Sequence, residues 1–452
     1  MTAINEFFAG LSGFLWGPWL LILLVGTGIW LTICLRGIQF RMLGYALRLT
    51  FSCERKGEGD ISHFGALMIA LSATIGVGNI AGVATAVALG GPGAVVWMWI
   101  TALFGMATKY SEGFLAVRFR TTNARGEISG GPMYYLEGGL GWRWLGVVFA
   151  FAGAIAAFGI GNMVQANTTA EAIVGVAGVS RTLVGGVLMV LTGLVIFGGV
   201  KWIAEVVSFF VPVMVVLYFG GSVLILIGNW EQVPSGLAML FEDALSGTAA
   251  SGGFAGATLA QAIRFGVARG LFSNESGLGS GPIAAAAART NQPAKQALVS
   301  MTGTFLDTIV VCSLTGLVLA TTRVWTSGET GVALTMQAFS AGLPGQWGQW
   351  IVTLGVVTFA FSTILGWSYY GEKCFEYLAG VKWVWYYRAV WCAVVFVGAV
   401  VKLDLVWNFA DAMNALMAVP NLIALLALSN LVRRETRQFE EGLKNGSICR
   451  YD

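Results

Sequence analysis

The chain has 452 residues, of which 56% are hydrophobic and only 11% are charged, and its net charge is +3. Because soluble domains carry about 25% charged residues, this composition excludes a water-soluble globular protein. The single histidine, His63, cannot form a zinc site, and the six cysteines lack the spacing of metal ligands. We expect a protein surrounded by a lipid bilayer, with no nucleic-acid partner.

Apolar runs long enough to cross a bilayer recur along the whole chain. A crossing helix needs roughly 20 mostly apolar residues, and this length predicts an all-α membrane protein with about eleven spans. The runs lie near residues 14–35, 64–89, 92–118, 145–175, 182–200, 204–228, 255–288, 296–320, 347–376, 384–401 and 405–432. The N-terminus has no basic region or cleavage site, so the first run is expected to be retained as a span.

The basic residues of the loops predict how the spans are oriented. Lys and Arg gather in segments 36–60, 118–143, 289–295 and 433–452, whereas segment 229–252 is acidic and has neither. With eleven spans, all the basic segments fall on one side. The positive-inside rule then places the N-terminus outside and the C-terminus in the cytoplasm of a multi-pass protein of the plasma (inner) membrane.

Two of the predicted loops have internal structure. Segment 130–135 reads Gly-Gly-Pro-Met-Tyr-Tyr and is cytoplasmic by this topology, and segment 325–345 resembles a short helix at the outer membrane surface. Both segments fit the role of a gate, and both fit equally well as packed connectors between spans.

A glycine-rich stretch interrupts the second span. Gly76, Gly78 and Gly82 each cost about 1 kcal/mol relative to alanine inside a helix, so the helix is expected to unwind there. Unwound backbone at membrane depth is tolerated only where it lines a cavity or binds a ligand. The new helix N-terminus would bind a carboxylate, and the freed carbonyls would suit sodium. Close helix packing by small residues is the alternative.

A second glycine-rich stretch, residues 270–282, interrupts the span near 255–288. It contains a Ser-Asn-Glu-Ser run at 273–276, which is expensive in lipid and should face a polar cavity. The two interruptions lie near the start of two blocks of five spans, 64–228 and 255–432. Interrupted spans at corresponding places in two halves point to a transporter site between inverted repeats.

Three charged residues, Arg264, Arg269 and Glu275, lie around the second interruption. Charges at this depth need partners. Structural pairing with Asp243 or Glu171 and direct contact with a substrate are the two interpretations.

Two more polar clusters lie on other spans. Ser362 and Thr363 adjoin on the ninth span, where hydroxyls usually bond back to their own helix. Together with carbonyls freed at the first interruption, they would instead complete an oxygen cage for sodium. On the fourth span, Asn162, Gln165 and Thr169 share one helical face. That face either holds helices together or lets Gln165 contact a ligand.

The motifs around these interruptions resemble a known family. Segment 90–105, Gly-Gly-Pro-Gly-Ala-Val-Val-Trp-Met-Trp-Ile-Thr-Ala-Leu-Phe-Gly, resembles the signature of the alanine or glycine:cation symporter family, and segments 74–79, 130–135 and 272–281 also match its pattern. The resemblance covers essentially the whole chain. It implies the amino acid–polyamine–organocation superfamily, whose fold is the five-plus-five inverted repeat known from the bacterial leucine transporter.

This fold implies four parts of the chain. Residues 1–60 would form an extra N-terminal transmembrane helix and a basic cytoplasmic loop, and residues 61–230 the first five-helix repeat. Residues 231–432 would form an extracellular loop and the second, inverted repeat, and residues 433–452 a cytoplasmic tail.

The resemblance also implies residue roles. The unwound N–H groups of the first interruption would take a substrate carboxylate, and carbonyls of the second would accept its ammonium, with bulky side chains limiting its size. Together with the candidates on the fourth and ninth spans, the substrate-binding residues would be Thr74, Gly76, Val77, Gly78, Gln165, Phe272, Ser273, Ser276 and Trp367. The sodium ligands would be Ser72, Ile75, Phe359, Ser362 and Thr363.

The implied activity is sodium-coupled symport of alanine or glycine by alternating access, with sodium cotransported and no enzymatic reaction. The adjacent hydroxyls on the ninth span favour sodium, and a proton is the alternative coupling ion. A channel would need a repeated pore-lining filter, a membrane-embedded enzyme a catalytic constellation, and a transporter-like sensor a soluble signalling domain. None of these is visible in the sequence.

Overall fold

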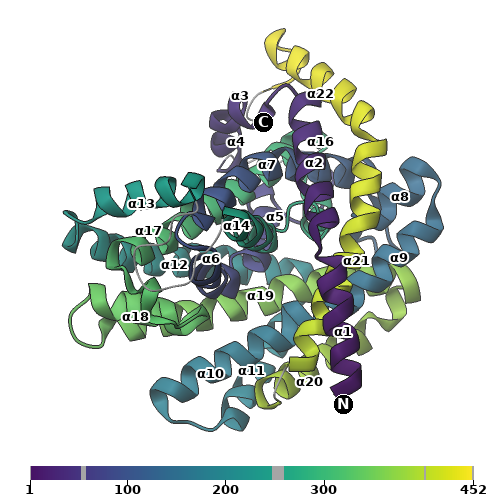
Figure 1. The fold of residues 1–452 in the computed structure, drawn as a ribbon. Coiled ribbons are helices and arrows are strands. Elements are labelled where there is room, and N and C mark those ends of the chain that lie inside the picture. Colours follow the sequence, from purple (N-terminus) through teal and green to yellow (C-terminus); the bar gives the residue numbers. More distant parts are fainter. Residues whose placement is uncertain (1, 52–56, 247–258, 402–403, 450–452) are drawn as a thin grey trace.

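The computed structural model describes residues 2–51, 57–246, 259–401 and 404–449, and nearly all of them are helical (Figure 1). The elements of the first half are α1 (Thr2–Leu15), α2 (Pro18–Cys34), α3 (Ile38–Arg41), α4 (Leu43–Thr50), α5 (His63–Thr74), η1 (Gly78–Gly82), α6 (Val83–Gly90), α7 (Ala94–Arg118), β1 (Thr121–Thr122), β2 (Ile128–Ser129), α8 (Pro132–Leu140), α9 (Arg143–Ala156), η2 (Ala157–Met163), α10 (Val164–Ala177), α11 (Arg181–Ile196) and α12 (Gly199–Gly228). Those of the second half are α13 (Val233–Ser246), α14 (Leu259–Asn274), α15 (Gly281–Ala286), α16 (Pro293–Thr304), η3 (Phe305–Cys312), α17 (Ser313–Thr322), η4 (Val324–Ser327), α18 (Gly331–Gly342), α19 (Trp347–Ala379), η5 (Val381–Trp383), α20 (Val384–Val400), α21 (Asp404–Ala427) and α22 (Ser429–Lys444).

The predicted spans coincide with one to three successive helical elements each. Within the described residues, seven helices are long and apolar enough to cross a bilayer, and α5 with η1 and α6 makes one further span, bent by 51°. Helices α7, α11 and α14 occupy the remaining predicted spans. The beginning of the predicted span 255–288 lies outside the described residues.

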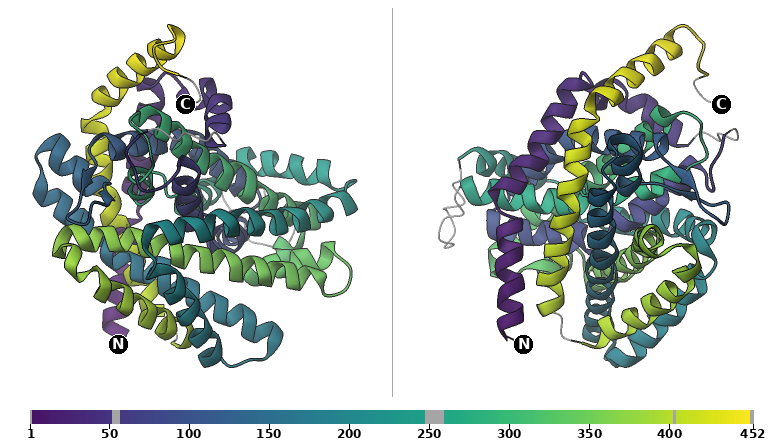
Figure 2. Two further views of the ribbon diagram at one scale, coloured as in Figure 1. Left: turned by 180° about the vertical axis from the view of Figure 1, so that it is seen from behind. Right: turned by 90° about the vertical axis from the view of Figure 1, so that its right-hand side faces the viewer.

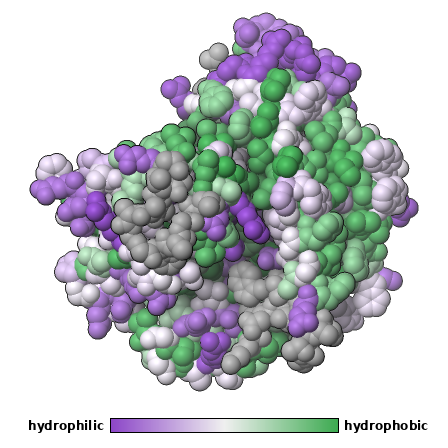
Figure 3. All heavy atoms as spheres, in the orientation of Figure 1, coloured by the Kyte–Doolittle hydropathy of each residue, from purple (hydrophilic) through white to green (hydrophobic). Residues whose placement is uncertain are grey.

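The surface of the molecule suits a bilayer. The long helices run across the molecule in both views of Figure 2, and apolar side chains cover much of the face shown in Figure 3. Phe209, Leu194 and Val216 are 73%, 68% and 68% exposed. Side chains of this kind are stable against lipid, and the helices satisfy their own backbone groups. The protein is therefore a multi-pass membrane protein.

Two ends of the molecule can be told apart. Helices α3, α4 and α22 lie at one end, called here the α22 side, and α10 and α18 lie towards the other, the α18 side (Figure 1). The last turn of α7 reaches the α22 side, where Arg118 pairs with Glu435 at 3.3 Å. Strands β1 and β2, which follow α7, form an antiparallel hairpin. The predicted topology makes the α22 side cytoplasmic.

The glycine-rich start of α7 packs against helix α13. Asp243 Oδ2 accepts the Gly93 N–H at 2.7 Å and so caps the N-terminus of α7. A Cβ on Gly93 would lie only 2.3 Å from the Ala244 nitrogen, and Trp97 Nε1 donates to the Ala244 carbonyl at 3.2 Å. The start of the motif at 90–105 thus packs α7 closely against α13.

Candidate functional site

The first interruption lies in the predicted glycine-rich stretch. Helix α5 ends at Thr74, and Ile75 leaves the helix with φ −76° and ψ 85°. The chain becomes helical again at Gly78. The N–H of Gly76 donates to Asn79 Oδ1 at 3.0 Å, so the Asn79 side chain caps the new helix start.

Four oxygens converge where α5 packs on α19. The hydroxyls of Ser362 and Thr363 lie 3.4 and 3.1 Å from the Ser72 carbonyl, and each lies 2.9 Å from the Phe359 carbonyl. Because each hydroxyl has one proton, at most two of these four contacts are hydrogen bonds at one time. A Cβ on Gly76 would lie 2.6 Å from Thr363 Oγ1. This proton-poor oxygen cluster therefore touches the first interruption.

The second interruption, between α14 and α15, is held by two side chains of α7. Glu112 Oε1 accepts the N–H groups of Gly277 and Gly279, both at 3.1 Å. Lys109 Nζ donates to the Glu275 carbonyl at 3.1 Å. Gly277 and Gly279 have φ of 93° and 83°, a conformation that glycine adopts without strain. The unwound backbone is thus satisfied by a neighbouring helix.

Asp307, on η3, connects the two interruptions. Its carboxylate accepts hydrogen bonds from Asn79 Nδ2 at 2.7 Å and from the Ser273 hydroxyl at 3.0 Å. The residue is fully buried. Asn79 follows the first interruption, and Ser273 precedes the second. A single buried carboxylate is therefore hydrogen-bonded to a residue beside each interruption.

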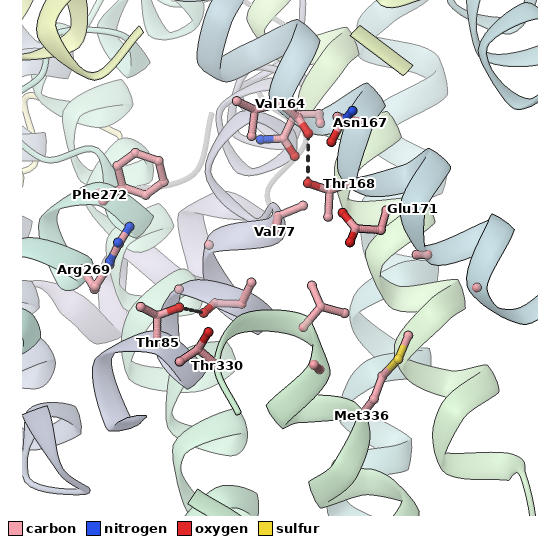
Figure 4. A pocket seen from close by; sticks show the side chains of 18 of the residues that line it. Val77, Thr85, Val164, Asn167, Thr168, Glu171, Arg269, Phe272, Thr330 and Met336 are labelled. Carbon is pink, nitrogen blue, oxygen red and sulfur yellow. Dashed lines mark hydrogen bonds between the residues drawn. The ribbon is translucent and has the colours of Figure 1, made fainter. Parts of the chain in front are cut away.

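A cavity of about 680 Å³ lies beside the first interruption. In Figure 4, Phe272 and Arg269 lie on one side of it and Glu171 lies on the other, with Val77 between them. Its lining reaches Thr330, which is exposed to the exterior just before α18. The cavity thus leads from the unwound backbone to the α18 side.

Comparison with known proteins identifies the family. Residues 1–451 match the model of the sodium:alanine symporter family. The chain belongs to this family. It is 54% identical over 444 residues to the sodium/alanine symporter AgcS of Methanococcus maripaludis, over 96% of this chain and 97% of that protein. It is 37% identical over 450 residues to the probable sodium/glutamine symporter GlnT of Bacillus subtilis, over 99% of this chain and 93% of that protein.

Solved structures of dissimilar sequence share the fold. MhsT in complex with L-phenylalanine superposes with a TM-score of 0.51 at 14% identity, over 84% of this chain and all of that chain. A manganese transporter of Eremococcus coleocola also gives 0.51, at 13% identity, over 83% of this chain and 80% of that chain. The predicted fold class, that of the bacterial leucine transporter, is confirmed. Both the family and the fold are those of membrane transporters.

Four of the predicted substrate-binding residues, Val77, Gly78, Gln165 and Phe272, line the cavity. The Gln165 Oε1 atom is buried and has no hydrogen-bond partner among the described residues. It lies 3.8 Å from the Cβ position of Gly76. An unpaired amide oxygen beside unwound backbone is suited to accept a hydrogen bond from a ligand.

Three other predicted residues have hydroxyls that are engaged elsewhere. Thr74 donates back to its own helix at 3.1 Å, and Ser273 donates to the buried carboxylate described above. The Ser276 hydroxyl lies 3.1 Å from that of Thr304. A ligand would meet these residues through their backbone.

Trp367 is not among the residues that line the cavity. It is 1% exposed and donates to Glu275 Oε1 at 3.0 Å. A Cβ on Gly161 would lie 2.2 Å from the Trp367 Cβ, so the two spans are in tight contact. The Gly76 N–H is used by the Asn79 side chain, so it is not available to a ligand in this conformation. The ligand roles of all these residues stay predictions.

Several residues at the site were not singled out from the sequence. Asp307 and Glu112 are acidic residues inside apolar runs, and an ionisable residue at membrane depth is a signal that could have found them. Asp411 was also missed. The two acidic partners considered for Arg269 from the sequence were Asp243 and Glu171. The charge of Arg269 instead interacts with that of Asp411. Both line the cavity.

Proposed function

We propose that this protein is a sodium-coupled symporter of small neutral amino acids, alanine and glycine above all, working by alternating access. Membership of the sodium:alanine symporter family and the high identity to a protein named a sodium/alanine symporter support this choice of ion and substrate. The transporter fold supports the alternating-access mechanism. A proton is the alternative coupling ion, and the experiment below distinguishes the two.

The observation that carries the proposal is the oxygen cluster of Ser72, Phe359, Ser362 and Thr363. It offers four oxygens with only two protons among them, and hard cations prefer oxygen ligands. With sodium at its centre, both hydroxyls would turn their lone pairs towards the ion. The carbonyl of Ile75, freed where α5 stops, would be the fifth ligand.

The amino acid would bind at the end of the cavity next to this cluster. The N–H groups of Val77 and Gly78, at the start of a helical segment, would take its carboxylate. The unpaired Gln165 Oε1 would accept its ammonium, and Phe272 would limit the side chain. Ion and substrate would then stabilise the same unwound backbone, and this shared conformation would couple their binding.

The cavity and the basic loops together indicate the side to which this conformation opens. The cavity leads to the α18 side, which the positive-inside rule places outside. In this orientation the protein lies in the inner membrane, with its N-terminus outside and its C-terminus in the cytoplasm. A zwitterion is neutral, so each cotransported sodium moves one charge, worth about 2.3 kcal/mol per 100 mV of membrane potential.

Uptake of labelled alanine into proteoliposomes tests the proposal. An inward sodium gradient should drive accumulation above the external concentration, and potassium should not replace sodium. A proton ionophore should leave sodium-driven uptake in place. Unlabelled glycine should compete strongly and glutamine weakly. Equal uptake in sodium and potassium would contradict sodium coupling, and stronger competition by glutamine would contradict the substrate assignment.

A further inference from the structure

The two interrupted spans are joined to each other at their ends on the α22 side. The N–H groups of Asp60 and Ile61, just before α5, donate to the Ala287 carbonyl, just after α15, at 2.9 and 3.2 Å. The Arg289 N–H donates back to the Ile61 carbonyl at 2.7 Å. These contacts form a short parallel bridge. The ends of the two interrupted spans are therefore linked directly through their backbones.

Arg120, at the base of the β1–β2 hairpin, clamps this joined pair. Its guanidinium donates four hydrogen bonds to backbone carbonyls, at 2.9 Å to Glu58, 3.0 Å to Ala286, 2.8 Å to Ala288 and 2.6 Å to Thr290. A guanidinium has five N–H groups, so nearly all of its capacity is used here. The clamp reaches both interrupted spans at once.

The hairpin is also fixed to the far end of α19. Lys373 Nζ donates at 3.0 Å both to the Ser129 hydroxyl and to Glu376 Oε2. Glu376 Oε1 accepts the Ser129 hydroxyl at 2.7 Å and Asn123 Nδ2 at 3.0 Å. Lys373 is 2% exposed and Glu376 is 5% exposed. Glu127 of the hairpin also lies 3.7 Å from Lys373 Nζ, so the hairpin contributes three polar residues to the cluster around this buried lysine.

This cluster lies at the opposite end of α19 from the cavity. Gln349, near the start of α19, lines the cavity. Lys373 lies about 36 Å further along the helix, at its rise of ~1.5 Å per residue. The same helix therefore borders an open cavity at one end and a closed polar cluster at the other.

We propose that the β1–β2 hairpin is a latch on the α22 side, and that Lys373 is the positioning residue that fastens it. While the cavity is open on the α18 side, Arg120 ties the hairpin to the two interrupted spans, and Lys373, Ser129 and Glu376 tie it to α19. For the site to open on the α22 side, the joined spans must separate from α19, so one of these two fastenings must release. This inference rests on the proposed transport function.

Hydrogen exchange and transport together test the latch. We would compare Ser129→Ala and Lys373→Met with matched controls on α19: Ser368→Ala, whose hydroxyl serves its own helix, and Glu372→Gln, which breaks a buried pair with Arg388 away from the hairpin. In the purified full chain, amide exchange would be followed by mass spectrometry in peptides covering 57–62 and 119–131. Alanine uptake would give KM and the maximal rate.

We expect Ser129→Ala and Lys373→Met to speed exchange in both peptides about fivefold or more, and to raise KM from the α18 side by a similar factor because less protein holds the open cavity. Lys373→Arg should largely restore both readouts. Equal effects in Ser368→Ala and Glu372→Gln, or exchange unchanged in both latch variants, would overturn the latch. Ser129→Ala keeps the Lys373–Glu376 pair, so it decides the matter if Lys373→Met does not fold. The hydrogen-exchange measurement tests the latch whether or not alanine is the substrate.

Discussion

Of the two aromatic residues expected to limit substrate size, Phe272 lines the cavity, whereas Trp367 is buried and is not part of its lining. The Phe272 ring lies close to the first interruption, 3.8 Å from the Cβ position of Gly78. A bulky side chain at this place would exclude larger amino acids by steric contact. We therefore propose that Phe272, rather than Trp367, limits the size of the substrate.

We expect Phe272→Ala to admit valine and leucine. An apolar pocket discriminates each methylene by only about 1–3 kcal/mol, so rejection of valine should weaken about tenfold or more. Trp367→Phe is the control, because it changes a buried ring without opening the cavity. The measurement is competition of each amino acid with labelled alanine uptake. A variant at Phe272 that keeps the original selectivity would show that another residue forms the wall.

Asp243 lies outside the predicted membrane spans, and its carboxyl group makes the stability of the protein depend on pH. Burial raises its pKa above the usual range, against the lowering effect of the Gly93 N–H. The folded protein therefore holds this proton more tightly than the unfolded chain. The stability from protonation is fully present below the unfolded pKa, about 3.9, and is lost as pH rises through the raised value.

Asp243→Asn keeps an acceptor for Gly93 and removes the buried charge. We expect its melting temperature to exceed that of the wild type at pH 7, with the difference shrinking towards pH ~4. Asp243→Ala removes the acceptor as well, and should be less stable than Asp243→Asn by about 1 kcal/mol at every pH. Thermal unfolding of the purified protein across this range measures both. A difference that grows with acidity would contradict the sign of the shift.

At the scale of the elements, the interrupted helix places two sites on one piece of backbone. The oxygen cluster lies against Gly76, and the cavity begins at Val77. Gly76 is not one of the glycines with a positive φ, so alanine can adopt its backbone conformation. What alanine cannot do is share the space with Thr363 Oγ1, which would lie 2.6 Å from the new Cβ.

We expect Gly76→Ala to displace the Thr363 hydroxyl and to abolish most sodium-dependent uptake while the protein still folds. Gly220→Ala, on α12, is the matched control, because its Cβ would meet no atom within 4 Å and Gly220 is not among the residues that line the cavity. Uptake at saturating alanine and varied sodium, with size-exclusion profiles as the check of folding, measures the effect. Normal sodium dependence in Gly76→Ala would separate the interruption from the ion site.

The two interruptions were predictable from sequence because glycine weakens a helix locally. Their surroundings were not, because the residues that hold them come from other spans. Glu112 and Lys109 reach the second interruption from α7, and Asp307 joins both from η3. Such long-range contacts leave no pattern in the segment that they hold.

At the scale of the whole molecule, the apolar runs predicted the spans well because length and hydropathy are set by the bilayer itself. The hairpin on the α22 side has strands of two residues each, too short for any alternating pattern. Its contacts with α19 join residues more than 240 positions apart. The way each helix face is shared among cavity, core and lipid depends on this tertiary packing, and so could not be predicted.

The central claim is that ion and amino acid bind to one unwound segment and therefore stabilise each other. Alanine affinity of the purified protein, measured with sodium and with potassium at equal ionic strength, tests this most directly. We expect sodium to tighten alanine binding about fivefold or more, with Thr363→Ala losing this effect and Thr358→Ala, whose hydroxyl serves its own helix, retaining it. Equal alanine affinity in sodium and potassium would contradict the account.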